Sequence, residues 1–169
     1  MATRMNVSAN YGTHLPCLIK AMSKTTGDVL ELGMGVFSTP YLHYQCLLSN
    51  RKLVSYDNNK GWAQWFINYG YQNPNHEIIA VDNYDDAQIE KAWDVVLVDH
   101  SPIERRVIDT RRLANLAKYI VIHDTSDRGE KEHHLSLIYP LFKYEMVYDK
   151  DKFQATILSN FIPLDDFWA

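Results

Sequence analysis

Short apolar runs alternate with longer amphipathic stretches along most of the chain. Seven of these runs are rich in valine, isoleucine, leucine and tyrosine and are bounded by polar or turn-forming residues, which is typical of β-strands. We predict strands at residues 29–32, 53–56, 77–81, 94–98, 119–123, 144–148 and 153–158. The run at 94–98 is almost continuously apolar, as expected for a strand covered on both faces.

Amphipathic segments between these runs predict helices at residues 14–23, 39–48, 60–69, 103–117 and 130–142. Strands that alternate with helices indicate a parallel sheet. The last two strands are joined only by residues 149–152, which are too few for a helical crossover, so we expect that pair to be antiparallel. The predicted fold class is therefore α/β, a Rossmann-like doubly wound sheet that is mostly parallel with an antiparallel last strand.

The helix predicted at 60–69 carries an aromatic stripe. Trp62, Trp65, Phe66 and Tyr69 lie at helical spacing, and we expect this face to pack against the sheet. Trp62 belongs to the first turn after the second strand, so it is also the aromatic side chain closest to any nucleotide bound there.

Composition and charge narrow the class of protein. The length of 169 residues suits a single domain, and 46% hydrophobic with 22% charged residues is ordinary for a globular protein. A net charge of -4 argues against a surface that coats nucleic acid. No signal peptide or membrane-length apolar run is present, and Cys17 and Cys46 stand alone, so we expect buried, reduced thiols and a cytoplasmic protein without membrane contact.

The most informative segment joins the first strand to the next helix. Gly33 and Gly35 form a turn that lets the backbone approach a ligand closely, and Ser38 stands where a dinucleotide-binding fingerprint has its third glycine. Glu31 lies two positions before the first glycine. A carboxylate there suits a ligand with a cationic group rather than a pyrophosphate.

The Glu-x-Gly-x-Gly segment at 31–35 resembles motif I of class I S-adenosylmethionine (SAM)-dependent methyltransferases, and the resemblance covers residues 28–158. It implies the class I methyltransferase fold, with SAM as the cofactor and the glycine loop around its methionyl part. It also implies one domain over residues 1–169, in which 1–27 form an N-terminal cap segment and 28–158 the core. Ser38 belongs to the cofactor-binding loop in this comparison.

Acidic residues end the next two predicted strands. Asp57 corresponds in the resemblance to the carboxylate that accepts both ribose hydroxyls, although enzymes that use NAD have a similar residue. Asp82 and Asn83 correspond to the position that contacts the adenine amino group. For Asp82 a solvated acid in a turn is an equally open alternative.

The fourth and fifth strands end in Asp99-His100 and His123-Asp124. Metal-dependent small-molecule O-methyltransferases are similar here, which implies that Asp99 and Asp124 hold a divalent cation, Mg²⁺ first. The alternative is that both acids belong to hydrogen-bond networks, because Thr125 stands where these enzymes have a second acid or amide. Asp99 and His100 are the catalytic candidates.

Two further histidines and a charged helix are also candidates for the neighbourhood of the site. Strand alternation predicts His123 on the face opposite Asp124, as a packed histidine rather than a base. Tyr11 and His14 could close the site from the N-terminal segment, although a plain helix start capped by Thr13 is the simpler interpretation. We expect a solvated face with local ion pairs from Glu104, Arg105, Arg106, Asp109, Arg111 and Arg112.

The expected function is SAM-dependent methyl transfer to a small molecule, at a hydroxyl group. The short chain leaves little room for a substrate-recognition domain, so either the acceptor is small or a second subunit of a homo-oligomer completes the pocket. Nucleic acid is not the expected partner. Two alternatives stay open: a protein that binds SAM without methyl transfer, as a sensor or partner subunit, and a nicotinamide-dependent oxidoreductase.

Overall fold

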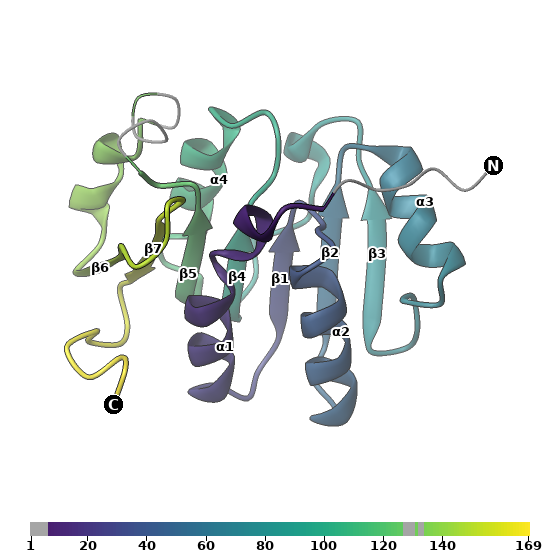
Figure 1. The fold of residues 1–169 in the computed structure, drawn as a ribbon, viewed down its shortest axis with the longest axis horizontal. Coiled ribbons are helices and arrows are strands. Elements are labelled where there is room, and N and C mark those ends of the chain that lie inside the picture. Colours follow the sequence, from purple (N-terminus) through teal and green to yellow (C-terminus); the bar gives the residue numbers. More distant parts are fainter. Residues whose placement is uncertain (1–6, 127–130, 132–133) are drawn as a thin grey trace.

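The computed structural model describes residues 7–126, 131 and 134–169. Within them, one sheet has the strand order β3-β2-β1-β4-β5-β7-β6 (Figure 1). The strands are β1 (Val29–Leu32), β2 (Leu53–Asp57), β3 (His76–Ala80), β4 (Trp93–Val98), β5 (Ala117–His123), β6 (Tyr144–Tyr148) and β7 (Ala155–Ser159). β1 to β5 pair in parallel, and β7 runs antiparallel between β5 and β6. The predicted fold class is confirmed.

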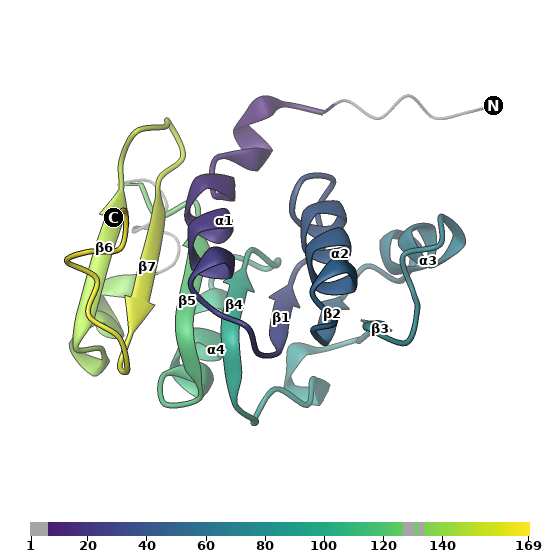
Figure 2. The same cartoon turned by 90° about the horizontal axis from the view of Figure 1, so that it is seen from below.

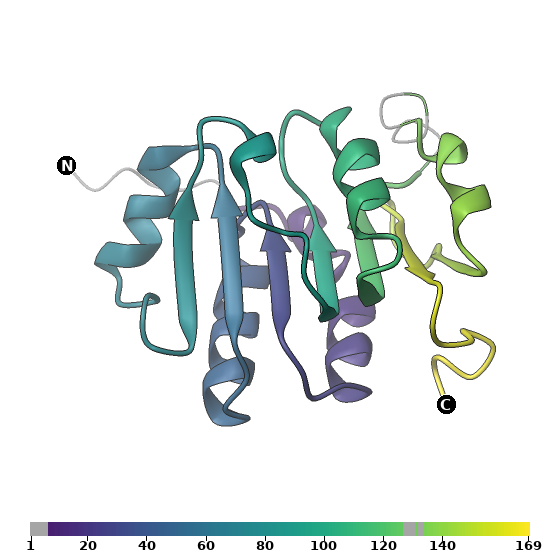
Figure 3. The same cartoon turned by 180° about the vertical axis from the view of Figure 1, so that it is seen from behind.

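Helices cover both faces of the sheet. They are α1 (Leu15–Ser23), α2 (Ser38–Leu48), α3 (Lys60–Asn68) and α4 (Arg105–Leu113), with short 3-10 helices η1 (Ala9–Gly12), η2 (Tyr84–Asp86), η3 (Leu135–Leu137) and η4 (Tyr139–Leu141). Figure 2 shows α1 and α2 on one face and α4 on the other, and Figure 3 shows α4 in front of β4 and β5. None of the helices among the described residues is long and apolar enough to cross a membrane.

Two predicted helices differ from the structure. The helix predicted at 103–117 ends at Leu113, because β5 already begins at Ala117 and pairs with β4 there. The described part of the helix predicted at 130–142 forms η3 and η4 instead of an α-helix; residues 130, 132 and 133 lie outside the described residues. Pro140 lies in the first turn of η4, where its missing N–H is tolerated but would break a longer helix.

Strand alternation divides the core into two layers. Leu30, Val96 and Ile120 belong to the layer on the α4 face, whereas Val95 and Val121 belong to the layer under α1 and α2. Successive side chains of a strand point to opposite faces, so residues at odd positions of β4 and β5 face α1. The same rule sorts the polar residues at the strand ends. Cys17 and Cys46 are buried and free in the second layer, as predicted.

Candidate functional site

The glycine loop after β1 passes close to the end of β4. Gly33 has φ +90°, and a Cβ at this position would lie 2.6 Å from the backbone N and Cα of His100. Its N–H donates to the carbonyl of Tyr56, 2.9 Å away. Only glycine combines this positive φ with so close an approach to a neighbouring strand.

Glu31 supports the loop from beneath. Its fully buried carboxylate accepts hydrogen bonds from Thr39 Oγ1 at 2.9 Å and from Ser55 Oγ at 2.6 Å. Thr39 Oγ1 in turn accepts from the N–H of Gly35 at 3.0 Å. Burial raises the pKa of Glu31 to about 7, against the opposing effect of these hydrogen bonds. Glu31 therefore contacts the loop through Thr39 and does not line the cavity above it.

Ser38 begins α2 and is also buried. Its Oγ lies 3.1 Å from the position that a Cβ would take on Gly35. The structure thus places Ser38 under the loop, beside Glu31, rather than on the surface that a ligand would meet.

The first cavity of the site lies over the end of β2. It has a volume of about 350 Å³ and is lined by Gly33, Met34, Asp57, Asn58, Asn59, Trp62, Asp99, His100 and Ser101. Asp57 Oδ2 accepts from the N–H of Met34 at 2.9 Å, and Oδ1 accepts from the N–H of Asn59 at 2.7 Å. Burial raises the pKa of Asp57, and the two backbone hydrogen bonds oppose that rise. Each carboxylate oxygen keeps a second lone pair for a ligand.

The second cavity adjoins the first on the side of β5. It has a volume of about 360 Å³ and is lined by Val7, Tyr11, Met34, Gly35, Val36, Trp62, Asp99, His123 and Asp124. Both cavities share Met34, Trp62 and Asp99, and Trp62 Nε1 donates to the Met34 carbonyl at 2.8 Å. The two cavities therefore form one cleft over the carboxyl ends of the parallel strands. Figure 1 shows the segment before α1 passing across these strand ends.

On the β5 side of the cleft, Asp99 lies next to three other polar side chains. Its Oδ1 lies 3.0 Å from Arg106 Nη2 and 3.1 Å from His123 Nδ1, and its Oδ2 lies 4.0 Å from His14 Nδ1. Burial by itself would raise the pKa of Asp99. The hydrogen bond to His123 and the charge of Arg106 outweigh burial and lower this pKa to about 2.

His123 and Asp99 occupy odd positions in register at the ends of the adjacent strands β5 and β4. Strand alternation therefore places both side chains on the same face of the sheet. The prediction that it lies opposite Asp124 is wrong: His123 Nε2 is 3.6 Å from Asp124 Oδ1. Asp124 follows the end of β5 with φ +57°, so the strand rule no longer applies to it. His123 is buried, as predicted, but it also lines the second cavity. Burial lowers its pKa, yet the hydrogen bond to Asp99 prevails and the pKa is raised.

His100 faces the opposite side of the sheet from Asp99. Its Nε2 lies 2.9 Å from Asp109 Oδ2 of α4, and its ring packs on Tyr84 with centroids 4.2 Å apart. Burial lowers the pKa of His100, while Asp109 opposes this effect. The two catalytic candidates Asp99 and His100 are therefore adjacent in sequence but belong to different polar clusters.

Asp82 and Asn83 do not line either cavity. Asp82 is largely exposed and pairs with Lys60 Nζ at 2.7 Å, and the Asn83 side chain caps η2 by accepting from the N–H of Asp85. The structure brings Gly33, Gly35, Asp57, Asp99, His100 and Asp124 to the cleft and leaves Asp82 and Asn83 outside it.

Arg106 is the residue that sequence reasoning missed. We expected it on a solvated helix face, but it is 4% exposed. Besides Asp99, it contacts the carbonyls of His100 at 2.8 Å and His123 at 3.0 Å and lies 3.8 Å from Asp124. A signal did exist, because two acids at buried strand ends need a cation nearby and α4 begins directly after β4. Asp109 is likewise buried, between His100, Arg105 and Arg112.

The pair Asp99 and Asp124 does not fit Mg²⁺. Both carboxylates face the same guanidinium of Arg106 and the same imidazole of His123. Mg²⁺ prefers six oxygen ligands. The space between these two carboxylates instead contains the guanidinium of Arg106 and a ring nitrogen of His123.

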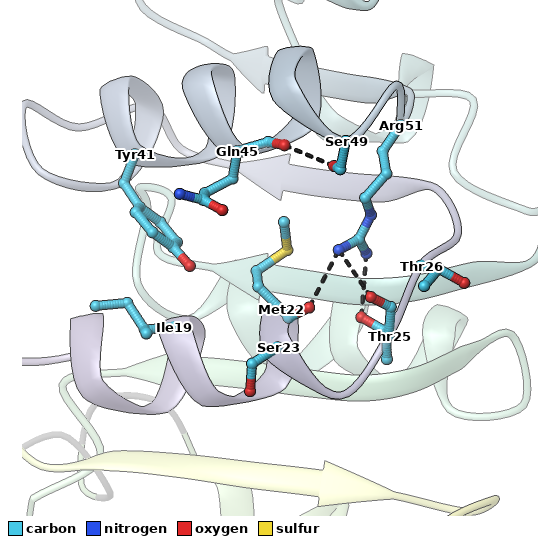
Figure 4. A pocket seen from close by; sticks show the side chains of 9 residues that line it. All are labelled: Ile19, Met22, Ser23, Thr25, Thr26, Tyr41, Gln45, Ser49 and Arg51. Carbon is cyan, nitrogen blue, oxygen red and sulfur yellow. Dashed lines mark hydrogen bonds between the residues drawn. The ribbon is translucent and has the colours of Figure 1, made fainter.

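A third cavity lies between α1 and α2, away from the glycine loop. Its volume is about 330 Å³, and its lining residues include none of those around the cleft (Figure 4). Arg51 in its wall donates to the carbonyls of Gly27, Met22 and Thr25. These contacts give Arg51 a structural role at the end of α1.

Comparisons with known proteins agree with this geometry at the level of the fold. No family model matches the chain, and no curated protein matches its sequence. Among solved structures, cofactor-bound Rv0187 from MTB is similar with a TM-score of 0.67 at 18% identity, over 95% of this chain and 84% of that one. The N-terminal domain of human METTL16 in complex with SAH has a TM-score of 0.59 at 8% identity, over 94% and 73%. The 23S rRNA methyltransferase ErmE has a TM-score of 0.56 at 15% identity, over 88% and 69%.

Such low identities show the fold and leave the acceptor open. The chain has the Rossmann-like fold of class I SAM-dependent methyltransferases.

Proposed function

We propose that the chain binds SAM in the cleft and transfers its methyl group to a hydroxyl of a small molecule. The observation that supports this most is the pair of cavities that meet at Met34 and Trp62. The first cavity offers Asp57, the second offers His123 and Asp124, and Asp99 lines both. A nucleoside in the first and an acceptor in the second would meet above the glycine loop.

In this proposal the Asp57 side of the cleft binds the nucleoside. Asp57 accepts the ribose hydroxyls with the lone pairs that Met34 and Asn59 do not use. Gly33 and Gly35 bring the backbone to the methionyl part, and Glu31 with Ser38 supports that loop from below. Asp82 and Asn83 are not part of the proposed site, because neither lines the cleft.

The Asp99 side of the cleft binds the acceptor. The sulfonium of SAM is already activated, so the protein has to align three atoms and accept one proton. We assign that proton to Asp124, which is 31% exposed in the second cavity, whereas Asp99 is held by Arg106 and His123. We assign no proton transfer to His100, because its Nε2 is bonded to Asp109 on the other face. Mg²⁺ is not part of the proposal.

Two features favour a small acceptor over a nucleic acid. The second cavity has a volume of only about 360 Å³, and the chain carries a net charge of -4. The main alternative acceptor is RNA, which the name of ErmE gives for that protein, so the test includes RNA.

The test measures formation of S-adenosylhomocysteine (SAH) from SAM with a panel of catechols, sugars and phenols, and separately with ribosomal RNA. We expect turnover with one class of small hydroxyl compound and its loss in Asp124→Asn, with Asp82→Asn as a matched control that keeps it. Turnover only with RNA would contradict the small acceptor. SAM binding without turnover on any acceptor would favour a sensor or partner subunit. A melting shift with NADH and none with SAM would favour an oxidoreductase.

A further inference from the structure

His14 is a buried histidine directly before α1. Its exposed fraction is 1%, and neither ring nitrogen has a hydrogen-bond partner within the described residues. Unsatisfied buried nitrogens are costly, which points to a ligand that satisfies them. The ring lies 4.6 Å from that of His123, centroid to centroid.

The hydrogen bonds of Thr13 determine which nitrogen of His123 carries a lone pair. Thr13 has one hydroxyl proton, and its Oγ1 lies 2.8 Å from the carbonyl of Phe153 and 3.3 Å from that of Asn10. Because that proton goes to a carbonyl, the Oγ1 must accept from His123 Nε2, which is 2.8 Å away. When the ring is neutral, its unprotonated Nδ1 then faces Asp99 Oδ1 at 3.1 Å. Two acceptors face each other there unless a proton or a metal ion joins them.

The two oxygens of Asp99 have different partners. Oδ1 contacts Arg106 Nη2 at 3.0 Å, whereas Oδ2 faces His14 Nδ1 at 4.0 Å. One ligand atom from each of His14, Asp99 and His123 lies within 4.8 Å of the others. His123 Nδ1 is 3.1 Å from Oδ1 and His14 Nδ1 is 4.0 Å from Oδ2, so each imidazole approaches a different oxygen of the carboxylate. Both separations are near the ligand–ligand edge of a tetrahedral site with bonds near 2 Å, which is roughly 3.3 Å.

We propose that His14, Asp99 and His123 bind a first-row transition ion, Zn²⁺ first, beside the cleft. Two imidazoles and one carboxylate suit Zn²⁺, Fe²⁺ or Mn²⁺ rather than Mg²⁺. Arg106 on Asp99 Oδ1 and Thr13 on the far nitrogen of His123 are outer partners of the kind that orient metal ligands in proteins, and Oδ2 is the carboxylate oxygen without Arg106. Asp99 and His123 line the second cavity, so a fourth coordination position opens toward it.

This inference is independent of the proposed methyl transfer, because the ligands can be tested without SAM. An ion here would hold a water or an acceptor oxygen at its open position and acidify it. The nicotinamide and sensor alternatives for the cleft are equally compatible with such a site.

The test is titration of the metal-free chain with Zn²⁺ by calorimetry and with Co²⁺ by visible absorption. We expect one ion per chain and the ligand-field bands of four-coordinate Co²⁺. Thr13→Val keeps all three ligands and removes the acceptor for His123 Nε2, together with the hydroxyl's own bond to a backbone carbonyl, so it should weaken binding about 10- to 100-fold. His14→Gln should abolish the Co²⁺ bands. His43→Gln changes another buried histidine, on α2, and should leave both signals unchanged.

Circular dichroism before titration shows whether each variant is folded. If His14→Gln does not fold, Thr13→Val is the variant that tests the site. No Zn²⁺ uptake by the folded wild-type chain would overturn the proposal. Uptake that is equal in the wild type, Thr13→Val and His14→Gln would also overturn it, because it would show an adventitious ion only.

Discussion

Arg106 Nη2 lies 3.0 Å from Asp99 Oδ1, so an ion pair between a buried guanidinium and a half-buried carboxylate joins the first turn of α4 to the end of β4. Removing one partner of such a pair leaves an uncompensated charge, which costs about 3–5 kcal/mol. We therefore expect Arg106→Met to lower the free energy of unfolding by an amount in that range, measured by urea denaturation. Arg111→Met on the exposed side of the same helix should stay within about 0.5 kcal/mol of the wild type. Equal effects of the two variants would contradict the structural role of Arg106.

Gly33 and Gly70 provide a matched pair of glycines with positive φ. Both would incur the strain of a left-handed conformation on substitution by alanine, about 1–2 kcal/mol. A Cβ on Gly70 meets no atom within 4 Å, whereas one on Gly33 would collide with the His100 backbone at 2.6 Å. Gly33→Ala should therefore destabilise the fold by about 1–3 kcal/mol more than Gly70→Ala. Thermal or urea denaturation of both variants measures this difference, and similar losses would argue against the close approach of the loop to β4.

Glu31 gives a pH-dependent contribution to stability whose sign follows from its pKa. The folded-state pKa is raised to about 7, so folding favours the protonated carboxyl. The contribution is fully present below the ordinary pKa of about 4.3 and is lost as the pH rises through about 7. Relative to Glu31→Gln, the wild type should lose about 3 kcal/mol of unfolding free energy between pH 4 and pH 8. Parallel curves for the two proteins would contradict a raised pKa.

Trp62 lines both cavities, and its Nε1 donates a hydrogen bond to the carbonyl of Met34. Trp62→Phe removes this bond, worth about 0.5–1.5 kcal/mol, so we expect SAH to bind about 2- to 10-fold more weakly. Trp65→Phe is the matched control, because Trp65 lies on the same helix and stacks on Trp62 with centroids 5.4 Å apart. Equal affinities of the two variants would show that the Trp62 bond does not support the loop.

Strand positions could be predicted from the sequence because buried parallel strands leave continuous apolar runs. The run 94–98 and the observed β4 agree except at Trp93, and the short connection after Tyr148 correctly predicted the antiparallel pair. The segment around Pro140 could not be predicted in the same way. Its apolar residues repeat at helical spacing, but proline limits the chain to short turns.

Sequence patterns are sufficient to predict some contacts of the site but not others. The parallel register of β4 and β5 aligns Leu97 with Val121, so two residues further the same rule brings Asp99 beside His123. Strand alternation could have found this contact. It could not place Asp124, because a left-handed φ after β5 turns that residue back toward His123. Helical spacing does not indicate the burial of Arg106, and the sequence signal for it is the pair of acids at the strand ends, which need a cation nearby.

Isothermal calorimetry of SAH with the wild type, Asp57→Asn and Asp82→Asn tests the central claim that this cleft binds a SAM-type nucleoside. Asp57 lines the first cavity, whereas Asp82 is exposed and pairs with Lys60 outside it. We expect one SAH per chain, affinity reduced at least about 10-fold in Asp57→Asn through loss of charged hydrogen bonds worth about 1.5–3 kcal/mol, and unchanged affinity in Asp82→Asn. No heat of binding with the folded wild type, or equal affinity in all three proteins, would contradict the account.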